Sequence, residues 1–322
     1  MSQFFREIVG QAISDPNFIE EGTIQSLWSG YGRIVRVRSI LDDHTFVVKH
    51  IKFPTHTDHP KGWSTRFSHE RKVKSYEVEM NWYRDFQNNQ ESLKYPKCFG
   101  TYSHNEEHII ILQDVNALGF SARKSDLTLL EIKSCLSWLA TFHATNLNVS
   151  DKGLWDRGSY WHLSTRPDEF TAMPNNPLKK AASRIDDVLN NCKYQTIIHG
   201  DAKVANFCFA ADANVMAVDF QYTGKGCGMK DVAYFLSSCL TDQECESQEK
   251  LLLDYYFNQL KKHISQYHEK INFNELEKEW RELYYYAWAD FVRFLQGWMP
   301  GHYKINQYSL AISDRVINEL TD

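Results

Sequence analysis

Three side chains in the second half of the sequence have the types and spacing of a phosphoryl-transfer site. An apolar run leads into a His-Gly-Asp tripeptide that ends at Asp201, and Asn206 follows Asp201 by five positions. A second apolar run ends at Asp219, which is followed by Phe. Phosphoryl transfer from ATP needs a carboxylate that orients the attacking hydroxyl and accepts its proton, and oxygen ligands for Mg²⁺. The pattern therefore predicts Asp201 as the catalytic base, and Asn206 and Asp219 as metal ligands.

The spacing between these residues carries more weight than any one of them. A single Asp often does no more than cap a turn, so the His-Gly-Asp tripeptide alone would be a weak signal. Asp201 and Asp219 are 18 positions apart, which leaves room for a turn, a short strand and a return strand. Such a hairpin would bring Asp201, Asn206 and Asp219 around one point.

With this motif, the sequence resembles the aminoglycoside phosphotransferase and choline kinase superfamily, most closely its ecdysteroid-kinase-like branch. The resemblance extends over nearly the whole chain. It implies a bilobal, protein-kinase-like fold in which Asp201 is the base, Asn206 and Asp219 hold magnesium, and His199 organises the loop. Lys203 stands where that branch usually has a Trp.

A second group of residues, nearer the N-terminus, is predicted to bind the nucleotide. Lys49 ends an apolar strand pattern and fits the lysine that steadies the α- and β-phosphates. Its expected ion-pair partner lies on the following helix, where Glu79 fits best and Glu77 and Glu70 are competitors. A glycine-containing turn would cover the phosphates, although an ordinary hairpin turn explains it nearly as well. The predicted nucleotide-binding residues are Lys49, Glu79, Ser29, Gly30, Tyr31, Gly32, Leu112 and Asp114.

The order of the expected elements predicts an α+β fold. Residues 24–112 show three strand patterns, a helix with apolar positions between 73 and 86, and two further strand patterns. Residues beyond 114 favour long helices, apart from strand patterns at 195–198 and 215–218. We therefore expect a small antiparallel β lobe at 1–114, which binds nucleotide, and a larger, mainly α lobe at 115–322 for catalysis and substrate binding. His143 is expected to be a core histidine, and Asp231 a structural residue at a helix N-cap.

Composition excludes several other classes of protein. The chain has 322 residues, a net charge of −5 and 43% hydrophobic residues, which is typical of a globular protein and argues against binding to nucleic acid or an anionic membrane. The first residues lack a secretory apolar stretch, and no run is long enough to span a membrane. Seven scattered cysteines without a CxxC pair favour neither disulfides nor zinc, so we expect the protein in the cytoplasm.

The expected partner is a small-molecule alcohol. Trp280, Tyr284, Trp288 and Phe291 form one helical stripe, which is most simply core. Other aromatic residues between 280 and 298, with Asp290, could instead line a pocket for a quaternary ammonium or a large apolar alcohol. The sequence thus predicts an ATP- and Mg²⁺-dependent phosphotransferase for an amino alcohol, aminoglycoside-like molecule, sugar or steroid alcohol. A nucleotide-binding pseudokinase that acts as an interaction module is the alternative, and a metal-dependent hydrolase is a weaker one.

Overall fold

The chain folds into two compact units, each with its own core. The computed structural model describes residues 2–27, 30–53, 66–86 and 93–321. The first unit holds Met1–Ala122 with Cys208–Ala211 and Met216–Val218, and the second holds the remaining residues. The predicted division into lobes at residue 114 stays a prediction.

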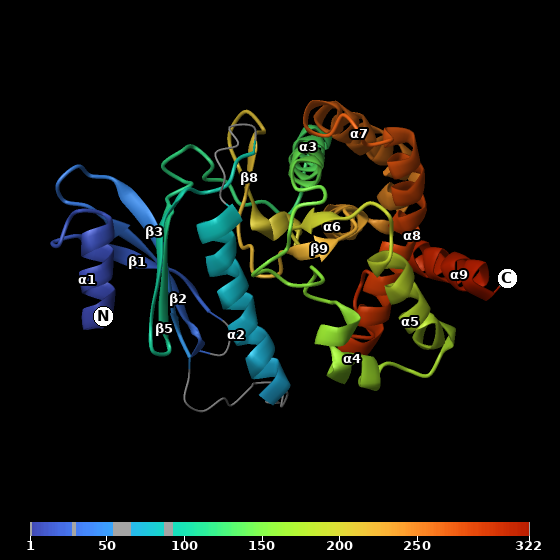
Figure 1. Ribbon diagram of the computed structural model, residues 1–322, viewed down its shortest axis with the longest axis horizontal. Helices are drawn as coiled ribbons and strands as arrows, with labels where there is room; N and C mark the ends of the chain where they lie inside the picture. Colours follow the sequence, from blue (N-terminus) through green and yellow to red (C-terminus); the bar gives the residue numbers. More distant parts are fainter. Residues whose placement is uncertain (1, 28–29, 54–65, 87–92, 322) are drawn as a thin grey trace. The chain divides into compact units, whose positions relative to one another are not determined.

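The first unit is built on a five-stranded antiparallel sheet. Its strand order is β1-β2-β3-β5-β4, so β3 and β5 are central neighbours. Figure 1 shows α1 and α2 on opposite faces of this sheet. The elements of this unit are β1 (Ile19–Ser26), β2 (Gly32–Arg38), β3 (Thr45–Lys52), β4 (Cys98–His104), β5 (Glu107–Gln113), α1 (Gln3–Ala12), α2 (Arg66–Asn81) and a π-helical turn (Trp82–Phe86).

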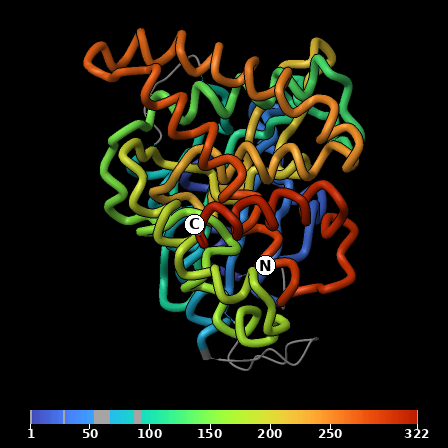
Figure 2. Tube along the Cα trace, turned by 90° about the vertical axis from the view of Figure 1, so that its right-hand side faces the viewer, coloured from blue at the N-terminus to red at the C-terminus, as the bar shows by residue number. Residues whose placement is uncertain are grey.

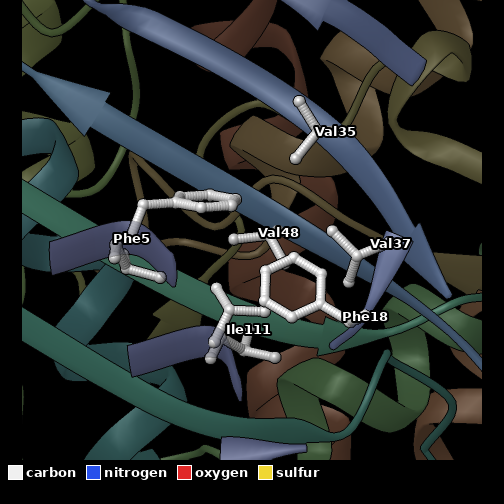
Figure 3. Close-up of a cluster of buried hydrophobic side chains, with 8 residues drawn as sticks. Phe5, Phe18, Val35, Val37, Val48 and Ile111 are labelled. Carbon is white, nitrogen blue, oxygen red and sulfur yellow. The ribbon is translucent and has the colours of Figure 1, made fainter. Parts of the chain in front are cut away.

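The strand alternation of β3 places apolar and polar residues on different faces. Val48 packs with Phe5 of α1 and with Val35 and Ile111 in a fully buried cluster, drawn in Figure 3. Each fully buried aliphatic side chain of this kind contributes about 1.5–3 kcal/mol. Because successive side chains of a strand point to opposite faces, Lys49 points to the other side, where α2 lies. The apolar core on one face therefore fixes the strand that carries this lysine.

The second unit is mainly helical. Its α8 packs against α4, α5, α6 and α9, and α3 packs along α7. Figure 2 shows α7, α8 and α9 following one another as the orange-to-red part of the chain. The helices are α3 (Leu129–Thr145), α4 (Pro167–Ala172), α5 (Pro177–Asn190), α6 (Met229–Cys239), α7 (Asp242–Tyr267), α8 (Phe273–Trp298) and α9 (Gln307–Thr321). The remaining elements are the 3₁₀ turns η3 (Leu163–Thr165) and η4 (Val204–Asn206) and the short strands β6 (Thr196–Ile198), β7 (Phe207–Phe209), β8 (Val215–Ala217) and β9 (Gly224–Gly226).

Local sequence signals explain where several of these helices begin. Thr128 and Glu131 form a capping box at α3, and Thr241 and Glu244 form another at α7. Asn272 caps α8 by accepting from the Glu275 amide. The predicted N-cap at Asp231 is wrong, because α6 begins two residues earlier, at Met229, so that Asp231 lies in its first turn. The α+β class expected from the sequence is confirmed.

Within the described part of the chain, no helix combines the length and the apolar character that crossing a membrane requires. Throughout those residues the cysteines are free thiols.

Candidate active site

Asp231 anchors the loop that carries the His-Gly-Asp tripeptide. Its carboxylate accepts the backbone N–H of His199 at 2.6 Å and that of Gly200 at 2.9 Å. It also contacts Nε2 of His143 at 3.1 Å, while Nδ1 of His143 contacts the Tyr256 hydroxyl at 2.7 Å. Asp231 and His143 are completely buried, as expected for a core histidine and a structural acid. The loop after β6 is therefore held by fixed acceptors rather than by solvent.

Gly200 is needed at the middle of the tripeptide. Its φ is +78°, a left-handed conformation that side chains with a Cβ rarely adopt. A Cβ there would lie 2.0 Å from the carbonyl oxygen of Tyr222. On its amino side, the buried His199 accepts the Asp201 amide through Nδ1 at 3.3 Å and packs against Phe220. This tight turn is what aims Asp201.

The two carboxylate oxygens of Asp201 have different environments. Oδ2 accepts from Nζ of Lys203 at 3.0 Å and from Nδ2 of Asn206, also at 3.0 Å. The same Asn206 amide donates to the Asp201 carbonyl at 2.8 Å. By contrast, Oδ1 is buried and has no hydrogen-bond partner among the residues that the structure describes. A buried acceptor without a donor is costly, so this oxygen is suited to receive one from a bound molecule.

Burial and neighbouring charges set the proton affinity of this pair. Burial, together with the charge of Asp219, raises the pKa of Asp201 against the lowering influence of the Lys203 ammonium. Burial alone would lower the pKa of Lys203, but the Asp201 carboxylate outweighs it, so the pKa of Lys203 is raised. Lys203 therefore stays protonated beside the carboxylate at neutral pH. The sequence marked Lys203 only as a departure from the family pattern and gave it no role.

Asp219 follows the β7–β8 hairpin, as the spacing had predicted. It lies one residue after Val218 with φ +69°, an unusual conformation for a residue other than glycine. Its Oδ1 accepts from Nε2 of Gln221, and the next residue, Phe220, is fully buried. Its charge acts on Asp201, so the two acids lie near each other. Strained backbone of this kind gathers at functional sites, where surrounding packing holds it.

The oxygen groups present fit a magnesium ion that also binds phosphate. Because Nδ2 of Asn206 is directed to Asp201, its carbonyl oxygen faces elsewhere and can serve as a hard ligand, as can the Asp219 carboxylate. Within the described residues, no three His, Cys, Asp or Glu side chains form a metal site of their own. Asn206 and Asp219 alone are too few ligands for a permanent structural metal, so an ion held by them would need further oxygen ligands from a bound molecule.

In the first unit, the predicted lysine and glutamate are paired. Nζ of Lys49 donates to Oε2 of Glu79 at 2.6 Å, and both side chains are almost completely buried. Lys49 also lies 5.5 Å from the ring centre of Tyr76, on the same helix as Glu79. Glu79 is thus the residue of α2 that meets Lys49, the choice favoured over Glu77 and Glu70.

The other predicted nucleotide-binding residues fall in a turn and in a strand end. Gly30 and Gly32 have φ +76° and +126°, and a Cβ on Gly32 would lie 2.0 Å from the His50 carbonyl oxygen. Tyr31 between them is buried, with its hydroxyl 2.6 Å from Nδ1 of His69, whereas Ser29 lies outside the described residues. Tyr31 lies directly before β2, and the predicted role of these residues in covering the phosphates stays a prediction.

Leu112 and Asp114 stand at the end of β5. Leu112 is paired with Val47 of β3, and Asp114 is buried. The Asp114 carboxylate accepts from Arg36 at 2.7 Å and from Thr45 at 2.8 Å. Its side chain is therefore engaged within the first unit, and the predicted role of Leu112 and Asp114 in binding nucleotide stays a prediction.

Two tyrosines beside Asp201 escaped the sequence analysis. Burial is the largest cause that raises the pKa of Tyr234 well above its usual value, and the nearby Tyr160 and Asp201 raise it further. Burial and Asp201 likewise raise the pKa of Tyr160, whose ring lies 5.4 Å from that of Tyr234. Tyr160 comes from a loop without a periodic pattern, so no local signal could have found it.

The aromatic stripe of α8 is core. Trp280, Tyr284, Trp288 and Phe291 are all buried. Asp290, the candidate anion for a quaternary ammonium, is also fully buried and is neutralised by Arg293 at 2.8 Å and Lys230 at 3.5 Å. The arrangement gives no support to a cation-binding role for Asp290.

The fold is that of the kinase-like phosphotransferases. A macrolide 2'-phosphotransferase from Brachybacterium faecium is similar over 99% of this chain and 98% of its own, with 12% identity and a TM-score of 0.52. An aminoglycoside phosphotransferase, solved as a ternary complex with ADP and hygromycin B, is similar over 97% of both chains, with 10% identity and a TM-score of 0.50. At these identities the likeness shows the fold alone.

The family follows from the sequence. The model of the ecdysteroid kinase-like family matches residues 36–154 and 158–269, so the chain belongs to that family. No curated protein matches the chain. The resemblance predicted from the motif is confirmed.

Proposed function

We propose that this protein is a phosphotransferase that moves the γ-phosphate of ATP to a hydroxyl of a small-molecule alcohol. The observation that carries the proposal is the asymmetry of Asp201. One oxygen is held by Lys203 and Asn206, and the other is buried and receives no hydrogen bond from the described part of the chain. An acceptor hydroxyl is the group that such an oxygen would bind and orient.

Each residue then has a definite task. Oδ1 of Asp201 accepts the hydroxyl hydrogen while the acceptor oxygen bonds to the γ-phosphorus and the bond to ADP breaks. The hydrogen bonds of Lys203 and Asn206 keep the carboxylate from rotating, so that Oδ1 stays directed at the acceptor. In the first unit, Lys49, fixed by Glu79, would bind the α- and β-phosphates.

A bound Mg²⁺ would supply charge neutralisation on the β- and γ-phosphates. Asn206 and Asp219 are the residues that would hold it, through the amide carbonyl and the carboxylate. The family and the fold support nucleotide use by this chain, and the oxygen ligands support magnesium rather than a softer metal.

The test is the substitution Asp201→Asn, which keeps the size and shape of the side chain but replaces the basic carboxylate with a neutral amide. Transfer of labelled phosphate from ATP to a panel of amino alcohols, aminoglycosides, sugars and steroid alcohols should fall by about 10²–10⁴-fold. Binding of Mg·ATP, measured by calorimetry, should change little. Asp187→Asn, an exposed acid on α5, is the matched control and should transfer normally.

The outcomes separate the alternatives. Transfer by the Asp201→Asn protein at the wild-type rate would refute the assignment of the base. Wild-type protein that binds Mg·ATP but transfers phosphate to no member of the panel would instead support the pseudokinase.

A further inference from the structure

Lys304 is a nearly buried cation close to the proposed base. It lies in the loop between α8 and α9, with 9% of its surface exposed. Its ammonium interacts with the charges of both Asp201 and Lys203. Lys304 contacts Ser237 of α6, and the next residue, Ser238, accepts the Val204 amide of the loop that carries Asp201. An acceptor that reaches Oδ1 of Asp201 therefore lies near Lys304.

The Lys304 ammonium has more N–H donors than its contacts within the protein use. Nζ contacts Ser237 of α6 at 3.4 Å, a long hydrogen bond. Around it are three rings, whose centres lie 5.2 Å (Tyr234), 5.6 Å (Phe291) and 5.9 Å (Tyr303) from Nζ. Among the residues that the structure describes, no carboxylate forms a salt bridge with Lys304. An ammonium has three N–H donors, so two remain for another acceptor.

The rings form a site of the kind that binds ligand cations, but a side chain of the protein occupies it. Aromatic rings attract an ammonium through their negative faces. Here the Lys304 ammonium already takes that position, and its charge opposes a second cation nearby. Lys203 adds a further positive charge next to Asp201. The surroundings of Asp201 thus favour an acceptor that brings oxygen atoms rather than an ammonium.

We propose that Lys304 determines the acceptor class: its spare N–H groups bind a second oxygen of the acceptor alcohol, and its charge excludes amino alcohols. This inference rests on the proposed phosphotransferase function and deepens it. The second oxygen is a hydroxyl, a carbonyl or a carboxylate, since each accepts hydrogen bonds from an ammonium. Tyr234, between Asp201 and Lys304, forms one side of the acceptor's surroundings.

The experiment uses cyclohexanols that differ only in the group across the ring from the reacting hydroxyl. That group is a hydroxyl, a carboxylate, an amine or a methyl. Labelled phosphate transfer gives kcat/KM for each probe with wild type, Lys304→Met and Lys304→Arg. Met keeps the length and apolar stem of the side chain but lacks the charge, whereas Arg keeps the charge.

For the wild type we expect kcat/KM to be about tenfold or more higher with the hydroxyl or carboxylate probe than with the amine or methyl probe, as the loss of one charged hydrogen bond predicts. Lys304→Met should remove that preference and admit the amine, and Lys304→Arg should retain it. The relative rates with hydroxyl and carboxylate probes tell a neutral acceptor from an anionic one.

Two results would overturn the proposal: a wild-type preference for the amine, or the same ranking of probes in Lys304→Met. Either would leave the phosphotransferase function standing, because that function fails only when the wild type transfers phosphate to no acceptor of the panel. If Lys304→Met does not fold, Lys304→Gln, which keeps a donor for Ser237 without the charge, replaces it in the same comparison.

Discussion

The pH dependence of stability gives a test of the Lys304 environment that needs no substrate. Burial lowers the pKa of Lys304 from 10.5 to about 8, with smaller influences from Cys239, Lys203 and Asp201. In the unfolded chain the ammonium regains its ordinary pKa. The perturbation is Lys304→Met, which removes the titrating group and keeps a side chain of similar length.

The direction in which the free energy of unfolding changes with pH follows from the number of protons that each state binds. Between pH 8 and 10.5 the folded protein has lost the Lys304 proton that the unfolded chain still holds. The unfolded state therefore binds more protons, and the free energy of unfolding rises with pH across this window. Below pH 8 both states are protonated and the cost of burying the charge is fully present. Above pH 10.5 that cost is gone.

The expected change in the free energy of unfolding is calculated from the pKa shift of Lys304. A change from 10.5 to about 8 is roughly two and a half pKa units, and each unit corresponds to about 1.4 kcal/mol. The free energy of unfolding of the wild type should thus rise, relative to Lys304→Met, by about 3 kcal/mol between pH 8 and 10.5. The Lys304 side chain is almost fully buried, so little of this is lost to solvent screening.

Groups that face Lys304 from other elements do not titrate in the same window. On α6, burial raises the pKa of Cys239 and of Tyr234 well above their usual values. On α7, burial raises the pKa of Cys245 to about 12. On the loop after β6, the pKa of Lys203 is raised by Asp201. Titrations elsewhere cancel in the difference between the two proteins.

The assay is urea unfolding followed by tryptophan fluorescence at several pH values from 7 to about 10.5, with equal m-values as the condition for comparison. Lys180→Met, which removes an exposed lysine of α5, should run parallel to the wild type. If the difference between wild type and Lys304→Met stays constant with pH, the ammonium is not desolvated and the reasoning about its spare donors is wrong.

Two further substitutions test the scaffold around the site. Glu79→Gln removes the carboxylate that pairs with the buried Lys49 ammonium and should lower the free energy of unfolding by about 3–5 kcal/mol, measured by urea unfolding; a change below about 1 kcal/mol would mean that the pair is not buried as described. Gly200→Ala forces a Cβ toward the Tyr222 carbonyl at a left-handed φ, so we expect loss of phosphate transfer and a destabilisation of more than about 1 kcal/mol, and normal activity in a transfer assay would contradict that geometry.

The parts of the fold that the sequence predicts are those specified by neighbouring residues. The strand pattern that contains Lys49 and the helix pattern that contains Glu79 are local periodicities, and both elements are present, with β3 continuing past Lys49 to Lys52. The spacing of Asp201 and Asn206 is also a local signal. Asn206 follows Asp201 by five positions, which allows the chain to turn so that the two side chains meet. Asp201 and Asn206 are indeed hydrogen-bonded to each other.

Errors arise where a long-range contact decides the local structure. An Asp before an apolar run usually caps a helix, and on that basis Asp231 was predicted as an N-cap. In the structure, the helix begins two residues earlier and Asp231 instead accepts the amides of His199 and Gly200. Those amides come from a loop about thirty residues away along the chain, which no local pattern reveals. Asp290 is a similar case, since Lys230 from another helix helps to neutralise it.

The acceptor side differs from the catalytic loop in how it is assembled, and that difference explains why the substrate class is hidden in the sequence. The proposed base and metal ligands come from residues 201–219, so a motif can describe them. The groups around the acceptor position come from the Tyr160 loop, from Tyr234 on α6 and from Lys304 before α9, each carried on a separate segment. None of these segments lies within the 201–219 motif. The positive charge near Asp201 thus has two sources, Lys203 inside the catalytic loop and Lys304 outside it, and a motif describes only the first.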